Sequence, residues 1–166
     1  MRIIVCPLHD VEALARVRRP SHILSLISPS ADPTGFECLA PHHLELRFND
    51  ITEPRDGLIA PTADHIRAIL DFARGSAGKG PLLIHCWAGV SRSTAAAFIV
   101  ACDRYKSSTS ELATRLRTAA PYCTPNKRMI AIADDVLGAQ GEIIRPIAAI
   151  GRGHDTTWGS AFELSD

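Results

Sequence analysis

An α/β fold with a central, mostly parallel sheet flanked by helices is predicted because strand-like and helix-like segments alternate and are then followed by helices alone. Continuous apolar runs at residues 22–27 and 82–85 are typical of strands buried on both faces. Helical spacing of apolar residues recurs at 62–75 and 93–105. With 166 residues, one domain over 1–166 is expected, with a core of about 1–140 and a C-terminal extension at 141–166.

The first half of the chain is expected to form three strands and two helices. Strands are predicted at residues 2–6, from a β-branched run, at 22–27, and at 43–48, where apolar and polar residues alternate. A helix over 11–19 would be capped by Asp10 and stopped by Pro20, and another over 62–75 would follow Pro61 and end at Gly75. Residues 28–41, rich in Ser, Pro, Asp and Gly, are predicted to be a loop.

The second half begins with the predicted strand at 82–85 and the alanine-rich helix at 93–105. Ser108 and Glu111 form a capping-box pattern for a helix over 111–120, which Pro121 closes. A last helix is expected at about 126–137. Beyond it no periodicity is clear, so residues 141–153 are assigned to a small strand and 156–166 to a loose tail.

Composition excludes several classes of function. Eighteen basic and eighteen acidic side chains cancel, so no overall charge favours nucleic acid or anionic lipid. No apolar run approaches the roughly 20 residues that span a bilayer, and a cytoplasmic protein is expected. The five cysteines contain no CxxC pair, and no HxxxH or HExxH pattern occurs, so neither a disulfide framework nor a metal or other cofactor is expected.

The segment that carries chemistry runs from residue 85 to 94 and reads HCWAGVSRST. It places Cys86 at the end of a strand and Arg92 in the first turn of the following helix, with five residues between them. Such a loop directs successive backbone N–H groups inward, and the helix dipole adds partial positive charge. The guanidinium offers two parallel donors to an oxyanion, and the same positive field stabilises Cys86 as the nucleophilic thiolate.

This motif resembles the phosphate-binding loop of the protein tyrosine and dual-specificity phosphatases, and a small bacterial-type enzyme is the nearest match. The resemblance implies that Cys86 forms a phosphocysteine intermediate, Arg92 binds the phosphoryl group, Ser93 assists departure of the thiolate, and His85 orients the cysteine, without a metal. The expected substrate-binding residues are the loop itself: Trp87, Ala88, Gly89, Val90, Ser91 and Arg92. Asn126, in a Pro-Asn pair before the last helix, resembles a supporting residue of dual-specificity phosphatases.

The general acid is sought on the polar loop upstream of the cysteine. Asp50, at the end of the third strand, is preferred because strand ends are held firmly and because the family places its acid there. Asp56 on the same loop is the rival, and Glu53 is a weaker one. Asn-Asp at a strand end is also ordinary turn chemistry, so that alternative stays open.

Substrate class and activity are narrowed but not fixed by these residues. The loop side chains between Cys86 and Arg92 are uncharged, which disfavours a multiply phosphorylated lipid and leaves a phosphorylated protein or peptide, or a small aryl phosphate. Tyrosine-only and dual specificity both remain open, as does the oligomeric state. A catalytically inactive phosphate-binding module and a rhodanese-like sulfur or arsenate enzyme are the competing interpretations.

Overall fold

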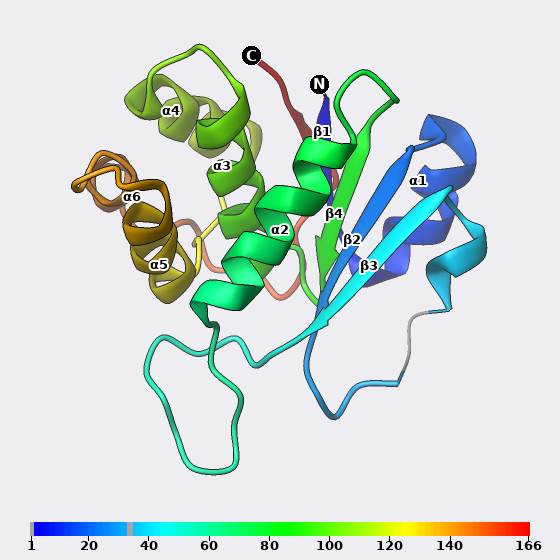
Figure 1. Cartoon of the computed structure of the whole chain (residues 1–166), viewed down its shortest axis with the longest axis horizontal. Coiled ribbons are helices and arrows are strands. Elements are labelled where there is room, and N and C mark those ends of the chain that lie inside the picture. Colours follow the sequence, from blue (N-terminus) through cyan, green and yellow to red (C-terminus); the bar gives the residue numbers. More distant parts are fainter. Residues whose placement is uncertain (1, 33–34) are drawn as a thin grey trace.

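The computed structural model describes residues 2–32 and 35–166, which form a five-stranded sheet covered by helices on both faces (Figure 1). The strand order is β3-β2-β4-β1-β5. The strands are β1 (Ile3–Pro7), β2 (His22–Ile27), β3 (His42–Arg47), β4 (Leu82–Cys86) and β5 (Phe162–Leu164). All pairings are parallel except that of β5 with β1. The predicted α/β fold is therefore confirmed.

Helices divide unequally between the two faces of the sheet. The elements are α1 (Val11–Arg18), α2 (Ala63–Gly75), α3 (Arg92–Arg104), α4 (Thr109–Ala119), α5 (Lys127–Leu137) and α6 (Ile144–Ile150), with short 3-10 helices at Leu8–Asp10 and Phe36–Cys38. Elements α2 to α6 share one hydrophobic cluster with the sheet, while α1 and Phe36 pack on the opposite face. Among the described residues, no helix is long and apolar enough to cross a membrane.

Several predicted boundaries are confirmed to within one or two residues because local signals decide them. Ser108 and Glu111 form the predicted capping box, and Thr62 forms another with His65 at the start of α2. The stretch Arg92–Ala101 of α3 is buried throughout, as its alanine-rich sequence predicted.

Three predictions were wrong. Residues 141–153 contain the helix α6 and not a strand, so α5 is not the last helix. Residues 156–166 are not loose, because Leu164 is buried and β5 pairs with β1. Asp10 occupies the capping position of α1 without making a side-chain hydrogen bond, since a 3-10 turn leads into the helix. The loop predicted at 28–41 is confirmed over its described residues, which include a short 3-10 turn at Phe36–Cys38; residues 33 and 34 lie outside the described residues.

The carboxyl ends of the four parallel strands meet at one edge of the sheet. The segments that leave this edge include the turn after β2, the long loop between β3 and α2, and the loop between β4 and α3. The β3–α2 loop projects beyond the body of the protein (Figure 1). Ligands of open α/β sheets bind at this edge, so the fold brings the candidate residues to a suitable place.

Candidate active site

The loop between β4 and α3 is held from outside by its carbonyl oxygens. Backbone N–H groups from four distant positions donate to them: Leu8 to Trp87 at 3.0 Å, Gly159 to Ala88 at 2.8 Å, Thr124 to Val90 at 3.0 Å, and Asn126 to Ser91 at 3.4 Å. These bonds fix the direction in which each peptide group faces. The carbonyls point toward the surrounding protein.

The amide groups of the same loop are left available. Within residues 2–32 and 35–166, no backbone N–H from Trp87 to Arg92 donates to a protein acceptor. Gly89 adopts a φ of +73°, which lets the chain turn tightly at its middle. Ser91 does not cap α3 with its side chain, so the positive end of the helix also faces the loop. A concavity of this kind suits an oxyanion.

Cys86 lies beneath this loop and is only 2% exposed. Its Sγ is 3.2 Å from the Ser93 hydroxyl oxygen, within hydrogen-bonding distance. The pocket that contains Cys86 has a volume of about 400 Å³ and is lined by Asp50, Arg92 and the loop. Nucleophile, hydroxyl and guanidinium, all predicted from the motif, are therefore brought together.

Arg92 is 4% exposed and anchored on one side only. Its Nη1 donates to the Phe48 carbonyl oxygen at 2.8 Å and to the Ser28 hydroxyl at 3.5 Å. Its buried Nε has no hydrogen-bond partner among the described residues. A buried, unpartnered guanidinium N–H is costly unless something binds it, and an anion could satisfy it together with the loop amides.

His85 supports the loop through a chain of polar contacts. Its Nδ1 lies 3.4 Å from the Cys86 carbonyl oxygen, its Nε2 lies 2.6 Å from Ser25 Oγ, and Ser25 Oγ lies 2.8 Å from His43 Nε2. Burial lowers the pKa of His85 to about 4, so the ring is neutral at pH 7. Because a carbonyl only accepts, Nδ1 carries the proton, Ser25 donates to Nε2, and His43 donates to Ser25.

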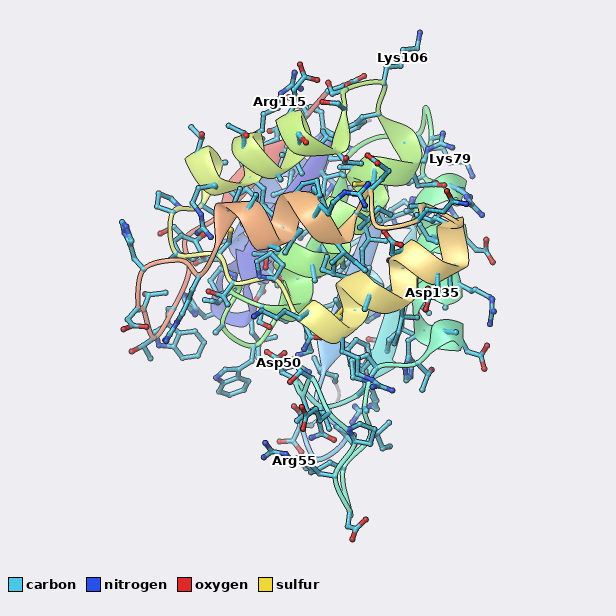
Figure 2. All side chains as sticks on the ribbon, turned by 90° about the vertical axis from the view of Figure 1, so that its left-hand side faces the viewer. Asp50, Arg55, Lys79, Lys106, Arg115 and Asp135 are labelled. Atoms are coloured by element: carbon cyan, nitrogen blue, oxygen red, sulfur yellow. The ribbon has the colours of Figure 1, made fainter. Side chains whose placement is uncertain are left out.

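Asp50 lines the pocket of Cys86, whereas Asp56 does not. Asp50 Oδ1 accepts hydrogen bonds from Ser91 Oγ at 2.8 Å and from Asn126 Nδ2 at 2.7 Å. Asn126 also accepts from the Met129 N–H at the start of α5, so it ties the β3–α2 loop to a helix. Figure 2 shows Asp50 close to the body of the protein and Arg55 farther out on the projecting loop.

Apart from Asp50, the wall residues outside the β4–α3 loop were not identified from the sequence. Trp87 is 57% exposed and packs against Trp158 with ring centroids 5.7 Å apart, so the C-terminal segment borders the site. Thr156 from that segment and Ser28 after β2 line the Cys86 pocket. Isolated hydroxyl residues in loops carry no sequence signal that could have marked them. Within the described chain, no cluster of three His, Cys, Asp or Glu side chains could hold a metal ion.

Comparisons by sequence found no matching family model and no matching curated protein. Solved structures do match. The crystal structure of DUSP15 has a TM-score of 0.62 and 19% identity, covering 89% of this chain and 90% of that one. Human tyrosine phosphatase-like serine/threonine/tyrosine-interacting protein gives 0.64 and 16%, covering 83% and 92%.

A third match is PTPMT1 in complex with PI(5)P, with a TM-score of 0.64, 14% identity, and coverage of 86% and 92%. At these identities the shared property is the fold. The resemblance predicted from the loop motif is thus confirmed at that level: the chain has the fold of the tyrosine and dual-specificity phosphatases.

Proposed function

We propose that this protein is a cysteine-dependent phosphatase that hydrolyses phosphoric monoesters of proteins or peptides, or small aryl phosphates, through a phosphocysteine intermediate. One observation carries the proposal. The backbone N–H groups from Trp87 to Arg92 and the buried Nε of Arg92 have no acceptor among the described residues, and they surround Cys86. Donors gathered around a sulfur nucleophile fit a phosphoryl group.

In the first step, the Cys86 thiolate attacks phosphorus, an S–P bond forms, and the bond from phosphorus to the leaving oxygen breaks. The loop amides and Arg92 stabilise the charge on the transferred oxygens. Asp50 donates a proton to the leaving alkoxide or phenoxide. Since its Oδ1 already accepts two hydrogen bonds, this proton is carried on Oδ2.

In the second step, water attacks phosphorus and the S–P bond breaks, which releases inorganic phosphate and restores the thiolate. The Asp50 carboxylate accepts the proton of the water. The Ser93 hydroxyl, 3.2 Å from Sγ, donates to the departing sulfur. His85 and Asn126 act as positioning residues, because their contacts hold Cys86 and Asp50 respectively.

Hydrolysis of a chromogenic aryl phosphate tests the proposal. The unmodified protein should release phosphate without added metal, and Cys86→Ser should abolish turnover. Cys38→Ser is the matched control because Cys38 is exposed and lies outside the Cys86 pocket. Turnover that survives Cys86→Ser would refute the mechanism. We also propose the cytoplasmic location expected from the sequence, and cell fractionation tests it.

A catalytically inactive phosphate-binding module is the alternative, since the fold alone does not establish turnover. Such a module needs the amides and Arg92 but has no use for a hydroxyl beside the sulfur. The contact between Ser93 and Cys86 therefore favours the enzyme. Tight binding of a phosphopeptide by the unmodified protein, with no phosphate released, would decide for the alternative.

A further inference from the structure

Next to the Cys86 pocket lies a second, polar pocket of about 480 Å³. Asp50 and Ser91 line both pockets, so the two share a wall. Two cations, Arg55 and Lys127, line the polar pocket. Both are exposed, and within the described part of the chain neither forms a salt bridge. The lining carries the two cations and one carboxylate, Asp50, so its formal charge is net positive and favours an acidic ligand group.

A third, largely apolar pocket of about 330 Å³ continues from the second. The two share Thr124, Pro125 and Lys127. The far wall comes from α6, where Ile147 is mostly buried and Ile144 is 41% exposed. The Thr124 and Asn126 N–H groups donate to carbonyl oxygens of the loop between β4 and α3. The segment 124–126 therefore joins the apolar pocket to the Cys86 pocket.

We propose that these pockets form one substrate groove, which selects phosphopeptides carrying an acidic residue near the phosphorylated residue and a large aliphatic side chain beyond it. This inference rests on the proposed phosphatase function and specifies its substrate. The acidic side chain pairs with Lys127 and Arg55, and the aliphatic side chain lies against Ile144 and Ile147. Apolar contact with a few placed charges is the usual composition of a recognition site.

A peptide fits this groove better than a phospholipid. The region between the catalytic and apolar pockets is polar, with Thr52, Asn126 and Lys127 among its lining residues. A peptide backbone can satisfy such groups with its own donors and acceptors, whereas an acyl chain would leave them desolvated. In addition, Arg92 is the one cationic side chain that lines the Cys86 pocket within the described residues, which suits a single phosphate.

Selectivity is measured as kcat/KM on synthetic phosphotyrosine peptides, with either glutamate or its neutral counterpart glutamine beside the phosphotyrosine and leucine placed in turn at each further position. One leucine register should be preferred over its alanine counterpart by roughly tenfold. Ile144→Glu should remove the leucine preference, and Lys127→Glu should remove the glutamate preference. Both variants should hydrolyse a small aryl phosphate as the unmodified protein does.

Matched controls are Val17→Glu, at a 78% exposed valine on α1, and Lys79→Glu, at a lysine far from Asp50 (Figure 2). Both should keep the peptide preferences. Absence of any preference, or an equal loss on the aryl phosphate, would overturn the groove. Faster hydrolysis of phosphatidylinositol phosphate vesicles that depends on Ile144 would overturn it in favour of a lipid. If the proposed phosphatase function itself is wrong, the unmodified protein will not hydrolyse the aryl phosphate at all, and this outcome distinguishes the two failures.

Discussion

Replacing Gly89 by alanine should damage both stability and catalysis, because this glycine meets two separate requirements. Its φ of +73° is a conformation that L-residues avoid, and a Cβ there would lie 2.8 Å from Pro7 N and 3.0 Å from the Cys6 carbonyl carbon. Both contacts are backbone atoms at the end of β1, so no side chain can rotate away. The loop or the strand must shift by several tenths of an ångström.

Gly138 provides the matched control for Gly89. It has a φ of +64° at the end of α5, and a Cβ there would meet nothing within 4 Å. Gly138→Ala should therefore cost only the conformational strain, about 1 kcal/mol. Gly89→Ala adds overpacking of about 1–3 kcal/mol, for an expected loss of about 3 kcal/mol in the free energy of unfolding.

The effect of Gly89→Ala on turnover follows from where the loop lies. A displacement approaching 1 Å at a reacting group can lower the rate by up to about 10²-fold, so kcat/KM on an aryl phosphate should fall by roughly 10- to 100-fold. Gly138→Ala should leave it unchanged. Urea unfolding and steady-state kinetics on the two variants provide the test. Equal losses of stability, with Gly89→Ala turnover within about twofold of the unmodified protein, would refute the steric reasoning.

Three further predictions concern the general acid, the hydroxyl and the histidine. Asp50→Asn should lower kcat by ~10²–10⁴, while Asp56→Asn should not; the reverse result would move the role to Asp56. Because Ser93 acts in the second step, Ser93→Ala should keep a rapid first release of phenol while its steady turnover slows by roughly tenfold. Stopped-flow kinetics that show no burst of phenol would contradict this. Because burial lowers the pKa of His85 to about 4, the unfolded chain binds more protons than the folded protein between pH 6.5 and 4. The free energy of unfolding should therefore fall by about 2 kcal/mol from pH 8 to pH 5. If the urea midpoint of His85→Gln falls by the same amount, His85 is excluded as the cause.

The motif from His85 to Ser93 could be predicted because its geometry is local. A strand end, a glycine turn and a helix start are contiguous in sequence, and each has its own signal. The same holds for the capping box at Ser108, where residues three apart satisfy one another's backbone. Local determinants also fixed β2 and β4, since continuous apolar runs have few alternatives in a protein of this composition.

The C-terminal segment could not be predicted because long-range contacts determine it. Helix α6 has only 7 residues and includes Pro146, and β5 has only 3. Neither would be stable alone. They are ordered because Ile147 and Leu164 enter the same hydrophobic cluster as the sheet, and because β5 pairs with β1.

Assignment of the general acid shows the same division between local and distant information. Sequence position could select a loop with two aspartates, and the reasons it gave for preferring Asp50 were strand-end rigidity and the family resemblance. Asn126, 76 residues away, binds Asp50 and thereby adds a constraint on the β3–α2 loop that no local pattern contains. The preference can therefore be stated physically: Asp50 is held at the pocket by α5. If Asn126→Ala lowered kcat on an aryl phosphate by the same factor in the Asp50→Asn variant as in the unmodified protein, α5 would have to act on the reaction through some route other than Asp50.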